Sequence, residues 1–237
     1  ILWPVQAVFA ASWPRIQTWP IPGVDWWWCS VAVCGMLGVV AARLLLQMGV
    51  LRWSFADYEE YVQDDEPLAD YPHARREMFV ELRYLLPVFI GLIAGGCIGL
   101  TLPAEGPPVI LQAIGASFIG YLSGAGLVWA IRILGTFAFG REAMGLGDVH
   151  LLGAVGAVFG WFDPILIFFL APFIGLSWIL ISSLVSAVAK RGRREMPYGP
   201  HLALATVFLF LCRPLVVEVW SILIPTVSMP QQALVGG

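Results

Sequence analysis

The sequence predicts an all-α, polytopic membrane protein with about six transmembrane helices and one acidic cytoplasmic insertion. Composition, the length of the apolar runs and the placement of the arginines carry this prediction. Of the 237 residues, 59% are hydrophobic and 12% are charged, and the mean hydropathy is +0.82. About 25% of a soluble globular chain is charged, so an ordinary soluble enzyme and a disordered chain are excluded. The formal net charge of −3 argues against nucleic acid as a partner.

Six apolar runs account for most of the chain. A helix needs about 20 apolar residues to cross the hydrocarbon core, and five runs meet or approach that length. The sixth, residues 149–162, is shorter because Asp163 and Pro164 end it before the next run begins. The five longer runs are residues 26–51, 85–102, 109–139, 164–189 and 201–224. We expect one membrane domain over residues 1–237.

The basic residues predict the orientation, because positive charge is retained on the cytoplasmic side of a membrane. Nine of the 13 fall in three loops that alternate correctly for one face: Arg52, Arg75, Arg76 and Arg83; Arg141; and Lys190, Arg191, Arg193 and Arg194. Residues 1–25 and the C-terminus are then extracytoplasmic. We expect a multi-pass protein of the inner (plasma) membrane, with residues 1–13 as the end of a helix that starts upstream.

Residues 52–84 form the predicted cytoplasmic loop, with nine acidic residues and four arginines. A charge run of this kind is most often a solvated loop, but opposite charge would also attract a basic substrate. Residues 71–82 mix aromatic, basic and apolar side chains, which is typical of an interfacial helix that contacts membrane lipid. The four cysteines lie in apolar runs without a metal-ligand spacing, so we expect no metal site and no cofactor.

Asp148 is the main candidate for chemistry. It lies at the predicted cytoplasmic end of the short run, just after Gly145 and Gly147. An ionisable group near the membrane interior is costly and indicates function, and glycines at this point would let another backbone approach the carboxylate. A second interpretation is that Asp148 only caps the following helix through its carboxylate.

The motif around Asp148 resembles that of a known family. Residues 140–157 read GREAMGLGDVHLLGAVGA and are followed by Gly160 and Trp161. This stretch closely resembles the signature of type IV prepilin peptidases, which are intramembrane aspartic endopeptidases of the GxGD class. The resemblance is strongest over residues 109–224. It implies a peptidase of type IV pilus or type II secretion systems that removes the leader of prepilin or pseudopilin precursors at the cytoplasmic face.

The resemblance also implies a second carboxylate, because two nearby carboxyls sharing one proton supply a base and an acid. The family usually carries it in an Asp just before an Ile-Pro segment, which this chain lacks. Asp57 is the internal candidate, and an aspartate upstream of residue 1 is the alternative. His150 stands where the family often has lysine, so it either supports Asp148 or has no chemical role. The 52–84 loop has no cysteine, which puts any methyl-transfer activity of the family in doubt.

Two other function classes remain open at this point. A presenilin-like or signal-peptide-peptidase-like protease shares the GxGD element, although its usual Tyr-Asp pair is absent from this chain. A transporter or non-catalytic membrane scaffold is the third class, with Arg213 and Glu218 as a charged pair within the last run.

Overall fold

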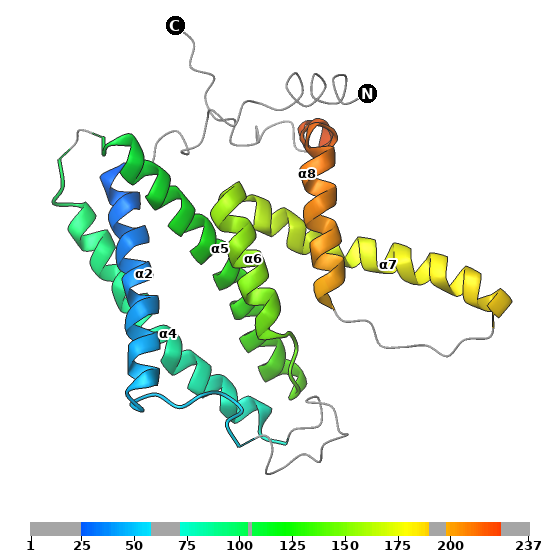
Figure 1. The fold of residues 1–237 in the computed structure, drawn as a ribbon, viewed down its shortest axis with the longest axis horizontal. Coiled ribbons are helices and arrows are strands. Elements are labelled where there is room, and N and C mark those ends of the chain that lie inside the picture. The colour runs from blue at the N-terminus through cyan, green and yellow to red at the C-terminus, as the bar shows by residue number, and fades with distance from the viewer. Residues whose placement is uncertain (1–24, 58–71, 104–105, 190–197, 224–237) are drawn as a thin grey trace, which may run out of the picture. The chain divides into compact units, whose positions relative to one another are not determined.

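The computed structural model describes residues 25–57, 72–103, 106–189 and 198–223, and all regular structure in these ranges is helical (Figure 1). The helices are α2 (Trp26–Gln47), α4 (Ala74–Gly99), α5 (Val109–Phe139), α6 (Leu146–Phe159), α7 (Asp163–Ala189) and α8 (Tyr198–Leu223). Four of them contain an apolar stretch long enough to cross a membrane, while α6 and the first part of α8 are shorter. The predicted all-α, multi-pass membrane fold is confirmed.

Most helices begin and end close to the predicted apolar runs. Asp25 caps α2, where its carboxylate accepts a hydrogen bond from the Trp28 N–H at 3.0 Å. Gly140 ends α5 in a left-handed conformation with φ of 73°, which glycine adopts without the steric cost of a side chain. The α8 backbone leaves helical geometry at Cys212, two residues before Pro214.

The predicted cytoplasmic loop 52–84 is shorter than expected. Helix α4 begins at Ala74, so the segment expected as a separate interfacial helix is instead the first three turns of a long helix. Two of the loop's acidic residues, Glu77 and Glu81, are buried in that helix, which corrects the interpretation of the whole run as solvated. The rest of the loop, residues 58–71, lies outside the described residues, as do the predicted extracytoplasmic residues 1–24.

The described residues divide into two compact units, one ending at Ile165 and the other starting at Leu166. In the first unit α2 packs on α4 and α5 packs on α6 (Figure 1). Glycines allow this close packing, as they do at many helix contacts in membranes. A Cβ atom on Gly38 would lie 2.6 Å from the Val88 Cα, and one on Gly120 would overlap the carbonyl group of Gly156.

In the second unit, the start of α8 contacts α7. The Tyr198 hydroxyl donates a hydrogen bond to the Phe168 carbonyl at 3.0 Å. His201 is buried beside Gly175, and its Nδ1 atom has no hydrogen-bond partner among the described residues. The packing of His201 against α7 therefore leaves one polar atom unsatisfied among the described residues.

Candidate active site

Asp148 lies in the first turn of α6, and it does not cap the helix. Gly145 occupies the capping position, with φ of −74° and ψ of 149°, and the helix starts at Leu146. The Asp148 N–H donates to the Gly145 carbonyl at 3.2 Å, so the residue is already inside the helical turn. The interpretation of Asp148 as an N-cap is wrong, because the helix begins at Leu146, three residues before the start of the predicted apolar run.

The Asp148 carboxylate is half-buried and has no hydrogen bond or ion pair with any described residue. It precedes the apolar stretch that starts at Val149. Burial without a compensating partner raises the pKa of the Asp148 carboxyl above its ordinary value. A carboxyl in this setting keeps its lone pairs available and is more easily protonated than an exposed aspartate.

The two glycines before Asp148 border open space. A Cβ atom added to Gly147 would meet no described atom within 4 Å, and one added to Gly145 would reach only the Asp148 Oδ2 atom at 4.0 Å. The close approach of another backbone that the glycines suggested is therefore not made by the described part of this chain. No described residue therefore fills the space beside these two glycines.

A buried arginine fixes the chain just ahead of this turn. Arg132 on α5 is 1% exposed, and its Nη1 atom donates to the Met144 carbonyl and to the Glu142 carboxylate. Both residues belong to the α5–α6 connection that leads into Gly145. Since Met144 directly precedes the capping glycine, the guanidinium sets where helix α6 starts.

The same guanidinium is neutralised from helix α4. Its Nε and Nη2 atoms donate to Glu81 at 2.9–3.1 Å, and the Trp129 indole N–H donates to the Glu81 Oε2 atom at 2.8 Å. Buried charges are tolerated when they are paired and hydrogen-bonded in this way. We call Arg132, Glu81, Glu142, Trp129 and the Met144 carbonyl the Arg132 cluster.

Asp57 lies in a segment, residues 52–57, that is tied to the same helix. Arg52 contacts the buried Glu77 at 2.5 Å and Asp57 at 3.7 Å, and the Phe55 N–H donates to Glu77 at 2.9 Å. Phe55 has an unusual φ of 57° for a residue with a side chain. Its ring also faces the Arg132 guanidinium at 5.7 Å.

These contacts bring the two candidate aspartate segments to one end of the first unit. The Asp57 segment is held through Glu77, and the Asp148 turn is held through the Arg132 cluster, which includes Glu81. Glu77 and Glu81 are one turn apart on α4. No hydrogen bond joins Asp57 to Asp148, and Asp57 is paired with Arg52 instead.

The described contact of His150 is with α5 and not with Asp148. It is exposed, and its Nδ1 atom lies 3.4 Å from the Tyr121 hydroxyl, which is a long separation for a hydrogen bond. A supporting role for His150 stays a prediction.

Glu77, Glu81 and Arg132 were not selected from the sequence. Two acids four residues apart at the start of an apolar helix share one face, and a lone arginine inside an apolar run requires a buried partner. These two signals together would have identified the Arg132 cluster. Among the described residues, no three metal-ligating side chains lie close enough together to hold a metal ion.

The fold and this site define a multi-pass helical membrane protein whose Asp148, at one end of the α5–α6 pair, has no partner in the part of the chain that the structure describes. Comparison with known proteins finds one matching family: residues 76–180 match the type IV leader peptidase family. The matched segment contains the Arg132 cluster and Asp148.

Similar proteins are known from several bacteria. A prepilin leader peptidase/N-methyltransferase of Aeromonas salmonicida is 33% identical over 140 residues, covering 54% of this chain and 42% of its own. The enzyme of the same name from Dichelobacter nodosus is 38% identical over 101 residues, covering 42% and 31%. Leader peptidase HopD of Escherichia coli is 34% identical over 104 residues, covering 42% of this chain and 61% of its own.

The matched region is thus less than two thirds of each relative's length. No solved structure matches the chain.

Proposed function

We propose that this chain is a membrane-embedded aspartic endopeptidase that cleaves the leader peptide of type IV prepilin-like or pseudopilin precursors. The observation that carries the proposal is the state of Asp148. It is a half-buried carboxylate that has no partner among the described residues, and it follows a glycine that borders open space within the segment that matches the leader peptidases.

Peptide hydrolysis at this site needs a base and an acid. A deprotonated carboxylate takes a proton from water, which attacks the scissile carbonyl, while a protonated carboxyl donates to the carbonyl oxygen. The raised pKa of Asp148 favours the acid role at the start of the reaction. The open face at Gly147 gives the extended substrate backbone room to approach the carboxyl.

The Arg132 cluster serves this mechanism as a positioning device. Catalysis loses rate steeply when a reacting group is displaced by about 1 Å, and a turn that contains two glycines is intrinsically pliable. The Arg132 bond to the Met144 carbonyl restrains the residue directly before that turn. Arg132 itself needs no contact with substrate for this role.

The second carboxylate remains to be assigned between Asp57 and an aspartate upstream of residue 1. Asp57 lies at the correct end of the first unit, but its ion pair with Arg52 must open before it can act. Glu81 is poorly suited, because both of its oxygens already accept hydrogen bonds from Arg132 or Trp129.

We place the active site at the cytoplasmic face of the inner membrane. The basis is the arginine-rich character of the connections at this end, which include Arg52, Arg76 and Arg141. The substrate is then a precursor whose leader is exposed to the cytoplasm, and the surrounding partner is membrane lipid.

A cleavage assay in membranes tests the proposal. A pilin-like precursor is incubated with this chain and with a version extended upstream, each with and without Asp148→Asn. We expect cleavage by at least one of the two forms and its loss, by at least about a hundredfold, with Asp148→Asn. The matched control is Asp25→Asn. It makes the same change at the N-cap of α2, and asparagine preserves the capping hydrogen bond.

The Asp57→Asn variant assigns the second carboxylate. If this chain cleaves and Asp57→Asn abolishes cleavage, the pair is internal. If only the extended form cleaves and it tolerates Asp57→Asn, the partner lies upstream. A folded, extended chain that cleaves none of several precursors would contradict the peptidase proposal and favour a scaffold.

A further inference from the structure

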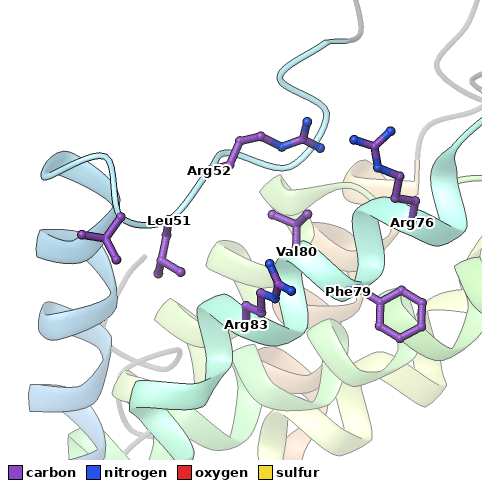
Figure 2. Close-up of a pocket in the computed structure, with 7 residues that line it drawn as sticks. Leu51, Arg52, Arg76, Phe79, Val80 and Arg83 are labelled. Carbon is purple, nitrogen blue, oxygen red and sulfur yellow. The ribbon is translucent and has the colours of Figure 1, made fainter.

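A hollow of about 410 Å³ opens where α2 ends and α4 begins (Figure 2). Its wall contains three arginines, Arg52, Arg76 and Arg83, and apolar side chains that include Phe79 and Val80. Figure 2 shows the Arg52 and Arg76 guanidinium groups on one side of Val80 and the Arg83 guanidinium on its other side. None of these arginines belongs to the Arg132 cluster.

Two of the three arginines carry charge that no described residue neutralises. Arg52 is paired with Glu77 and Asp57. Arg76 and Arg83 form no ion pair with any described residue, and both are exposed. They lie seven residues apart on α4, which is two helical turns, so they share one face with Val80 between them. The hollow is therefore a cationic site with an apolar floor.

The same face of α4 continues as an apolar surface beyond the arginines. Phe79, Leu86, Ile90 and Ile93 follow one another at helical spacing and are all more than half exposed. Since α4 is long and apolar enough to cross a membrane, this surface is suited to acyl chains. A ligand of this region has an anionic head and an alkyl body.

We propose that the hollow binds the phosphate of an anionic phospholipid headgroup, with Arg76 and Arg83 as its ligands and the acyl chains along α4. Guanidinium groups donate paired, charge-assisted hydrogen bonds to phosphate oxygens. Anionic lipids concentrate positive side chains at the cytoplasmic membrane surface, which is the depth at which α4 begins. A free phosphate would make the same hydrogen bonds to the arginines, but it has no acyl chain to contact the apolar surface of α4.

Lipid binding to the purified full chain in neutral detergent tests this site. Phosphatidylglycerol and phosphatidylcholine with the same acyl chains are titrated and followed by native mass spectrometry. We expect selective binding of phosphatidylglycerol by the unmodified chain. The Arg76→Gln/Arg83→Gln variant should bind it about 30-fold more weakly, which corresponds to about 1 kcal/mol for each arginine.

Arg75→Gln is the matched control, because it removes the same charge from the neighbouring residue, which does not line the hollow. It should keep nearly all of the affinity. The Arg76→Lys/Arg83→Lys variant keeps both charges and should bind with intermediate strength, since an ammonium group lacks the planar fork. Arg52 is left unchanged in all variants, because it is bonded to the buried Glu77.

Competition with inorganic phosphate distinguishes a phospholipid headgroup from free phosphate as the ligand of Arg76 and Arg83. Millimolar phosphate should displace little phosphatidylglycerol if the acyl chains contribute. Phosphate that binds at Arg76 and Arg83 more tightly than the lipid would overturn the lipid assignment. Unchanged lipid binding in the double glutamine variant, or an equal loss with Arg75→Gln, would overturn the site itself. Neither readout depends on the proposed peptidase activity.

Discussion

The Arg132 guanidinium is bonded to both carboxylate oxygens of Glu81 inside the helical bundle, and it joins α5 to α4 at the point where the chain turns toward Asp148. Neither side chain is more than 3% exposed. A buried pair of this kind is costly to form from water but far more costly to break on one side. The pair therefore holds the first unit and the candidate active site in one arrangement.

Removing one member of this pair should destabilise the protein strongly. We expect Glu81→Gln or Arg132→Met to lower the free energy of unfolding by about 3–5 kcal/mol. Arg132→Met leaves Glu81 buried without a counter-charge, and Glu81→Gln leaves Arg132 with only the more exposed Glu142 as its counter-charge. The double variant should lose less than either single variant. Denaturant unfolding in detergent, analysed as a double-mutant cycle, measures this coupling. Additive single effects would contradict the assignment of a buried pair.

Arg132→Lys should separate the positioning role from the stabilising role. Lysine keeps a positive charge for Glu81, but its ammonium cannot also reach Glu142 and the Met144 carbonyl in the same planar geometry. We expect most of the stability to remain, with kcat reduced about tenfold or more and KM little changed. Cleavage kinetics on a precursor provide the readout. A variant with wild-type kcat would show that the bond to Met144 does not position Asp148.

The same substitution at two glycines should have opposite effects. Gly147→Ala places its methyl group in open space, so we expect unchanged or slightly higher stability, by up to about 1 kcal/mol. If substrate backbone uses that space, kcat/KM falls nevertheless. Gly120→Ala instead forces a methyl group into the Gly156 carbonyl and should lower stability.

Unfolding midpoints and kcat/KM for both alanine variants, measured in one detergent, test this contrast. A loss of stability in Gly147→Ala would mean that another part of the chain occupies the open face. Undiminished kcat/KM in that variant would mean that substrate approaches from elsewhere.

The pKa of Asp148 predicts how stability depends on pH. Burial raises the pKa of this carboxyl above its ordinary value of 3.8, so the folded state prefers the protonated form. Below the ordinary pKa both the folded and the unfolded state are protonated, and the residue does not change the free energy of unfolding. As the pH rises from the ordinary pKa to the raised one, the free energy of unfolding falls, and above the raised pKa it levels off. Asp148→Asn should therefore be more stable than the unmodified chain at pH 7.

The difference between the two proteins should disappear as the pH approaches 3.8. Unfolding midpoints measured from acid to neutral pH test this. An Asp148→Asn variant that is less stable at pH 7 would indicate that the ionised carboxylate is stabilised by a partner, contrary to the structure.

The helices could be predicted from the sequence, because a membrane-spanning segment must be a long apolar run. Inside the bilayer there is no water to bond the backbone N–H and C=O groups, and a helix pairs them within the segment. The run at residues 109–139 coincides with α5. The start of α4 was placed too late, because Arg75, Glu77 and Glu81 interrupt the apolar pattern although they lie on a continuous helix.

Sequence alone determined the all-α membrane fold, the resemblance to type IV prepilin peptidases and the choice of Asp148 as the candidate carboxylate. These follow from local features, namely apolar length and a contiguous motif. Tertiary structure decided that Glu81 and Arg132, 51 residues apart, form a pair, that Gly147 faces open space and that Asp148 is inside the helix rather than at its cap. Such relationships depend on how two helices pack, and local periodicity does not encode which side chains then meet.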